Sequence, residues 1–225
     1  MLIKTKIRGT KRFRLFDQDT GDTVTLELLG KGMFADVYYD AAHPDRVFAI
    51  IPDDKGDYSK EILASIQEDG NQNPFLPQVK RGGDTADARV FVMPRYFVPL
   101  RAEHKKAWAQ YRKLKTCIDQ APVSRSIHDG HKRADAVVSC VEASGDAELI
   151  EALELLRDYM ATYGSSYTFE FAPRNLGVDA SGHLILLDVV FDLEAAQKLR
   201  KPAPPAYDRA AADAFYRQHL PGLYK

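Results

Sequence analysis

The 225-residue chain has only two cysteines, Cys117 and Cys140, which have neither zinc-site spacing nor the pattern of a disulfide framework. A reducing compartment fits such a chain. No apolar run approaches the roughly 18 residues that a membrane span needs, and the first residues have no signal-peptide core. These absences predict a protein of the cytoplasm with no membrane partner.

The chain also lacks a net charge of either sign, since its formal charge is only -1. That balance points to no particular partner and makes a nucleic acid an unlikely one. Basic residues do gather at 1–14 and 101–115. Such runs could contact phosphate or an acidic protein, or they could be the solvated faces of a strand and a helix.

The two halves of the chain differ in their predicted secondary structure. Short β-prone runs dominate residues 1–100, interrupted by one helix at 59–68 that Ser59 could cap. Helices dominate 101–225. They are expected at 102–120, at 146–163 with Asp146 as the N-cap, and at 208–219, whereas 121–145 shows no clear period and 201–206 is a Pro-rich linker. The order predicts an α+β protein with a β-rich small lobe and a helical large lobe.

The most informative stretch is 167–192. Asn175 follows Glu170 by five residues, a turn spans 179–182, and a short apolar strand ends at Asp188. An acid that orients a hydroxyl, followed by an amide oxygen and a carboxylate that hold magnesium, is the order of groups used in phosphoryl transfer. Each residue alone fits a turn or a strand end, but the ordered set favours a catalytic loop.

A glycine-rich segment lies far upstream, as that interpretation requires. Gly30, Lys31 and Gly32 sit between two β-prone runs, and glycines there allow backbone amides to approach phosphate oxygens. A hairpin with two glycines is common, so this segment gains its meaning from the later motif.

Taken together, these motifs resemble protein kinases, and most closely the compact serine/threonine protein kinases of T7-like bacteriophages. The resemblance covers about residues 23–192. It implies a two-lobed fold of mostly antiparallel small lobe and reduced large lobe, with ATP and Mg²⁺ bound between the lobes. The resemblance implies that Gly30 and Gly32 cover the phosphates and that Glu61 pairs with the strand lysine. It implies that Met93 is the gatekeeper and that residues 94–96, including Tyr96, form the hinge that faces adenine. It also implies that Glu170 is the catalytic acid and that Asn175 and Asp188 are the metal ligands.

The chain departs from that family at several of these positions. The strand at 47–51 has no lysine, because Ala49 or Ile51 takes its place. Lys31 or Lys55 could supply the charge, and Lys31 is the better candidate because its loop would lie over the phosphates. Lys31 could instead be a solvated residue at the tip of a hairpin. Glu170 replaces an aspartate and so changes the reach of the carboxylate. Val189 and Val190 follow Asp188 where a kinase has Phe-Gly.

Two functions therefore remain open. One is an ATP- and magnesium-dependent kinase that modifies serine or threonine of a host protein, with activity weakened or lost. The other is a pseudokinase, a binding module that inhibits a host protein without catalysis. The resemblance implies a phage origin and the host cytoplasm as the location.

Overall fold

The computed structural model describes residues 12–16, 23–84, 88–121, 129–143 and 145–199. Its main sheet is antiparallel, with strand order β1-β2-β3-β4-β6-β5. The strands are β1 (Arg12–Phe16), β2 (Thr23–Lys31), β3 (Asp36–Asp40), β4 (His43–Pro52), β5 (Lys80–Asp84) and β6 (Ala88–Pro94). The sheet matches the β-rich half predicted from the sequence.

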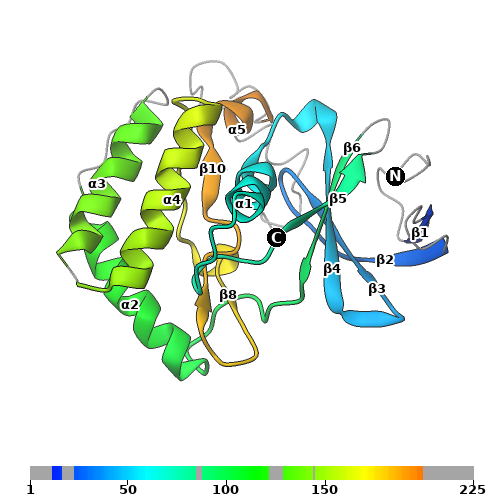
Figure 1. Ribbon diagram of the computed structural model, residues 1–225, viewed down its shortest axis with the longest axis horizontal. Coiled ribbons are helices and arrows are strands. Elements are labelled where there is room, and N and C mark those ends of the chain that lie inside the picture. The colour runs from blue at the N-terminus through cyan, green and yellow to red at the C-terminus, as the bar shows by residue number, and fades with distance from the viewer. Residues whose placement is uncertain (1–11, 17–22, 85–87, 122–128, 144, 200–225) are drawn as a thin grey trace, which may run out of the picture.

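Most helices form the other side of the molecule, and helix α1 lies between α4 and the sheet (Figure 1). The helices are α1 (Ser59–Glu68), α2 (Lys105–Gln120), α3 (Gly130–Glu142), α4 (Ala147–Tyr163) and α5 (Leu193–Leu199). Helix α4 packs against both α3 and α1. Asp146 caps α4 as expected, since its side chain accepts a hydrogen bond from the Leu149 amide at 3.3 Å. The predicted α+β architecture with two lobes is confirmed.

Short strand pairs follow α4 and fold the stretch 167–192 back on itself. Strand β7 (Tyr167–Phe169) pairs with β10 (Val190–Asp192), and β8 (Gly177–Val178) pairs with β9 (Leu184–Ile185). Because these pairs are antiparallel, the residues after β7 and those before β10 meet at one point. The sequence positions 170 and 188 are thereby neighbours in space.

One apolar core extends from the sheet into the helices. Ile51 of β4, Ile62 of α1, Leu153 of α4 and Leu184 of β9 belong to the same cluster, and each is fully buried. The inward face of α1 arises from apolar residues at helical spacing. The space between the sheet and the stretch 167–192 is therefore backed by buried apolar side chains.

Two helices were not predicted, and one expected cap is wrong. Helix α3 lies in the stretch where no period was recognised, although Ala134, Val137, Val138 and Val141 are its buried residues and have helical spacing. Helix α5 was also missed. Ser59 does not cap α1; it is the first helical residue. The predicted helix at 208–219 and the linker at 201–206 lie outside the described residues, as does most of the basic run at 1–14.

Candidate active site

A cavity of about 500 Å³ lies between the sheet and the stretch 167–192. The residues predicted to form the site line it, with the exception of Glu61: they are Gly30, Lys31, Gly32, Met93, Tyr96, Glu170, Asn175 and Asp188. A volume of this size suits a nucleotide-sized ligand. Residues more than 150 positions apart in the sequence thus border one space, as the catalytic interpretation requires.

Asn175 and Asp188 are joined through their backbones at the base of the cavity. The Asp188 amide donates a hydrogen bond to the Asn175 carbonyl at 2.8 Å. The Asn175 side chain is buried, and its Nδ2 donates to the Glu170 carbonyl at 3.1 Å. This bond fixes the amide group and leaves its Oδ1 as an acceptor for a ligand.

These two side chains suit magnesium in part. Mg²⁺ prefers oxygen ligands and is held in many sites by one or two carboxylates together with the phosphates of the substrate. Among the described residues, no group of three or more His, Cys, Asp or Glu side chains could hold a metal. The amide oxygen and the carboxylate would therefore need phosphate oxygens or water to complete the metal's shell.

Glu170 stands directly after β7, near the Asn175–Asp188 pair. Its amide donates to the Val189 carbonyl at 2.7 Å, and its carboxylate forms an ion pair with Arg174. The Glu170 side chain is about one-third exposed and that of Arg174 is mostly exposed. A substrate hydroxyl could reach Glu170 only if Arg174 shared or released the carboxylate.

The loop from residue 30 to 35, here called the Gly loop, covers the cavity from the sheet side. Its tight turn is closed by the Gly32 amide, which donates to the Ala35 carbonyl at 2.7 Å. The Phe34 ring contacts Phe191 edge-on, with 5.9 Å between ring centres, and Lys55 Nζ donates to the Met33 carbonyl at 2.5 Å. These contacts hold the loop down over the cavity.

The sheet side of the cavity is apolar. Val47 and Ala49 on β4 and Met93 on β6 all line it, and Met93 is buried opposite Val47 in the strand register. Tyr96 follows β6, and its hydroxyl accepts a hydrogen bond from the Gln78 amide at 2.9 Å. Burial raises the pKa of Tyr96, so the hydroxyl stays protonated. A flat heterocycle such as adenine would find an apolar slot here.

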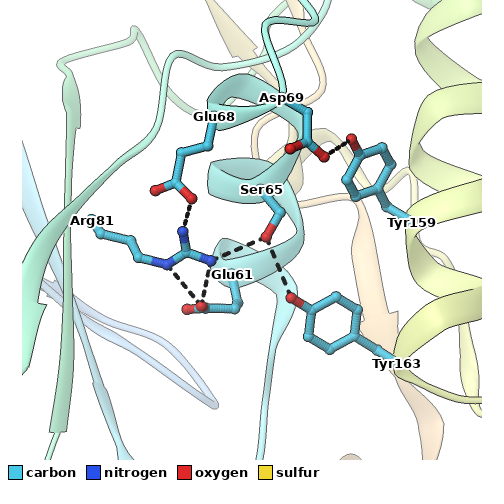
Figure 2. Close-up of polar contacts among 7 residues, drawn as sticks. All are labelled: Glu61, Ser65, Glu68, Asp69, Arg81, Tyr159 and Tyr163. Atoms are coloured by element: carbon cyan, nitrogen blue, oxygen red, sulfur yellow. Dashed lines mark hydrogen bonds and ion pairs between the residues drawn. The ribbon is translucent and has the colours of Figure 1, made fainter.

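The role that the resemblance implied for Glu61 is not the one in the structure. Figure 2 shows Glu61 beside Arg81, whose Nη2 lies 2.6 Å from its carboxylate and 3.1 Å from the Ser65 hydroxyl; Arg81 also pairs with Glu68. The reason is helical geometry, because adjacent helical residues point about 100° apart. Glu61 therefore faces β5, away from the cavity.

Its neighbour Lys60 faces the cavity instead, and sequence reasoning missed it. Lys60 Nζ donates to Asp188 Oδ1 at 2.6 Å and to the Leu187 carbonyl at 3.0 Å, although the residue is only 6% exposed. A signal was present in the sequence: Lys60 shares a helix face with Leu63 and Ala64, three and four positions on, which are both buried.

A second acid, Asp57, lies beside Lys60 and also lines the cavity. Its carboxylate accepts hydrogen bonds from the Ser59 hydroxyl at 2.7 Å and the Ser59 amide at 3.3 Å, so Asp57 satisfies the start of α1. Burial raises the pKa of Asp57 and the Asp188 charge raises it further, while the Ser59 hydrogen bonds and Lys60 oppose this rise.

No protein-family model matches the chain, and no curated protein matches it. Among solved structures, the chain is similar to one described as the structure of vaccinia related kinase 3, with 12% sequence identity and a TM-score of 0.37. The match covers 83% of this chain and 54% of that kinase, so the chain spans about half of the kinase's length.

The element order and the cleft, not this distant match, carry the fold assignment. Strands β1 to β4, with the Gly loop between β2 and β3, are followed by α1, then by β5 and β6, then by the helical half and the stretch 167–192. The fold is protein-kinase-like. The comparisons give no support to a closer relation to phage kinases, which stays a prediction. Among the described residues, no helix is long and apolar enough to cross a membrane.

Proposed function

We propose that the protein binds ATP with magnesium in this cleft and transfers a phosphoryl group to a serine or threonine hydroxyl of another protein. One observation carries the proposal: the Gly loop, the apolar slot and the Glu170, Asn175 and Asp188 side chains border the same cavity. Each group has a separate task in phosphoryl transfer, and the tasks require that they converge.

The chain's own residues divide the work as follows. The apolar slot holds adenine and the Gly loop amides cover the phosphates. Asn175 and Asp188 would hold a magnesium ion, which when bound would neutralise charge on the phosphates. Glu170 accepts the proton of the hydroxyl as its oxygen bonds to the γ-phosphorus. In the same in-line step the bond from that phosphorus to the bridging oxygen breaks, and ADP leaves.

A binding module without catalysis is the second candidate, and two observations favour it. The Glu170 carboxylate is already paired with Arg174, which occupies one of its oxygens and leaves less room for a substrate hydroxyl. Leu29, Phe97 and Val98 are exposed large apolar residues beside the hinge and line a second hollow of about 750 Å³. A surface of this kind suits a protein partner. For either candidate function, we propose a host protein as the target, a phage origin for the protein and the host cytoplasm as its location.

Thermal unfolding with and without ATP and magnesium tests the proposal. A ligand that binds only the folded state adds about 2.7 kcal/mol at roughly 100 times its Kd, so the wild type should melt at a higher temperature with the nucleotide. Asp188→Ala should lose this gain. Asp119→Ala is the matched control, because Asp119 is an exposed carboxylate that pairs with Lys115 on α2.

Transfer of labelled phosphate to protein substrates then separates the two candidates. Nucleotide-dependent stabilisation with transfer that Asp188→Ala abolishes supports the kinase. Stabilisation without transfer to any protein in a bacterial lysate supports the binding module. A wild type that gains no stability with ATP and magnesium contradicts nucleotide binding altogether.

A further inference from the structure

We propose that Lys60, on helix α1, provides the cation that contacts the phosphates of the bound nucleotide, in place of the lysine that β4 lacks. This inference rests on the proposed nucleotide binding and names a residue for it. The position is unexpected, because the resemblance assigned that cation to a strand and assigned the helix only an acid.

The geometry of Lys60 is the first support. Its ammonium group lies at the base of the cavity and uses two of its three donor protons, one toward Asp188 Oδ1 and one toward the Leu187 carbonyl. One donor remains for a phosphate oxygen. Asp188 keeps a second carboxylate oxygen for a metal ion, so Lys60 and magnesium can share the acid without excluding each other.

Burial is the second support. A lysine only 6% exposed carries a large desolvation cost that a single half-exposed carboxylate offsets only in part. On the cavity side Lys60 lies close to two acids, Asp57 and Asp188. A phosphate would add further charge of the sign that a buried ammonium favours.

Other lysines near the cavity fit the role less well. Lys31 lines the cavity, but its side chain is 52% exposed and its ammonium group lies 4.0 Å from the carboxylate of Asp36. Lys55 donates to the Met33 carbonyl and is not among the residues that line the cavity. Lys60 alone of these three combines burial, contact with Asp188 and access to the cavity.

Strand β4 offers a direct way to test the replacement. Ala49 is buried, lines the same cavity and occupies one of the two positions where the resemblance expects lysine. If ATP binding requires a cation near the phosphates but not a particular position for it, a lysine introduced at position 49 should compensate for the loss of Lys60.

The experiment measures the affinities of ATP, ADP and adenosine for the wild type and for Lys60→Met. Loss of a hydrogen bond to a charged group should weaken ATP binding roughly 10- to 100-fold. Adenosine binding should change by less than about twofold, since it has no phosphate. Lys115→Met, which removes an exposed lysine of α2, should bind all three ligands like the wild type.

Two further variants make the result specific. Lys60→Arg should retain most ATP affinity, because it keeps the charge, and adding Ala49→Lys to Lys60→Met should restore much of it. Lys31→Met should have an effect below about threefold. A phosphate-dependent loss in Lys31→Met with none in Lys60→Met would overturn the inference.

A measurement on the unaltered protein protects the test against a variant that fails to fold. An acyl-phosphate derivative of ATP places an acyl carbonyl next to the terminal phosphate; a nearby lysine amine attacks it, forms an amide and displaces ATP. Mass spectrometry should locate the acyl group on Lys60, and excess ATP should prevent the reaction. Labelling of Lys31 or Lys55 in its place contradicts the proposal.

These results also separate this inference from the proposed function. A wild type that binds neither ATP nor ADP removes both. A wild type that binds ATP, with Lys60→Met binding it equally well, leaves the nucleotide site in place and removes only the role of Lys60.

Discussion

The two walls of the cleft differ in how firmly they are held. The lower wall, formed by residues 167–192 and α1, is anchored by buried side chains and backbone hydrogen bonds, although the Asp188 side chain itself is 55% exposed; Leu186 is fully buried and Asn175 is 9% exposed. The upper wall is the Gly loop and its flanks, where Leu29 and Met33 are 44% and 49% exposed. Asn175 and Asp188, which would need exact placement to bind a ligand, lie on the lower wall. The Gly loop, past which a ligand would enter, is held by few contacts.

The difference is physical in origin. The lower wall shares the main apolar core, so any displacement there would expose buried surface. The Gly loop is tied down chiefly by the Phe34–Phe191 contact and by Lys55. Local opening of the loop therefore costs far less free energy than movement of Asn175 or Asp188.

The largest expected effect compares two phenylalanines, one packed behind the lower wall and one in the Gly loop. Phe75 is 1% exposed, and its carbonyl accepts a hydrogen bond from the Leu186 amide at 2.8 Å. Phe75→Ala should lower the free energy of unfolding by about 3–5 kcal/mol, since it leaves a cavity in the core. Phe34→Ala should cost less, because Phe34 is only partly buried and its contact with Phe191 adds only about 0.5–1.5 kcal/mol to that partial burial. Urea unfolding of both variants measures the difference, and equal losses would contradict the comparison.

An intermediate effect is expected from Asp57, which lies in the firm wall. Its pKa in the folded protein is raised above the ordinary value of 3.8, so the folded state holds the proton more tightly than the unfolded chain does. Protonated Asp57 therefore stabilises the folded state. This contribution to the free energy of unfolding is complete below pH 3.8 and is lost as the pH rises through the raised pKa of the folded protein.

Asp57→Asn should remove this dependence while it keeps an acceptor for the Ser59 amide. The stability of the variant minus that of the wild type should therefore increase as the pH rises from 3.8 through the raised pKa. Unfolding by urea at a series of pH values measures it. A difference that stays constant with pH would show that the carboxylate is not perturbed by burial.

The smallest effects should come from the two glycines of the Gly loop, and they should be unequal. A Cβ at Gly32 would lie 3.0 Å from the Ala35 carbonyl oxygen, whereas one at Gly30 would meet nothing within 4 Å. Gly32→Ala should destabilise the protein by about 0.5–1 kcal/mol, and Gly30→Ala should stay within about 0.5 kcal/mol of the wild type. Thermal unfolding can measure both, and a larger loss at Gly30 would show that the loop conformation differs from the one described.

Sequence reasoning located the elements whose signals are local. The Asn175 and Asp188 spacing, the Gly loop and the apolar period of α1 and α4 each follow from a short segment. The side of α1 that faces the cavity was predicted wrongly, because Glu61 received its role from its position in the family pattern. A shift of one residue along a helix turns the side chain by about 100°, which is enough to point it away from the cavity. The helix face shared with Leu63 and Ala64 could have indicated that Lys60 is buried, but its partner Asp188 lies 128 positions away and could not be inferred from the local sequence. Helix α3 was missed although its buried residues Ala134, Val137, Val138 and Val141 have helical spacing, because the β-branched valines and the polar residues between them weaken the helical signal.

The continuous core that joins Ile51, Ile62, Leu153 and Leu184 has a consequence for how this cleft works. In a molecule whose halves are separate bodies, substrate entry and product release can proceed by a hinge between them. Here such a hinge would have to pull apart the side chains that stabilise the whole molecule. We expect a ligand to enter and leave the cleft by local displacement of the Gly loop, while the shared core holds the two halves together.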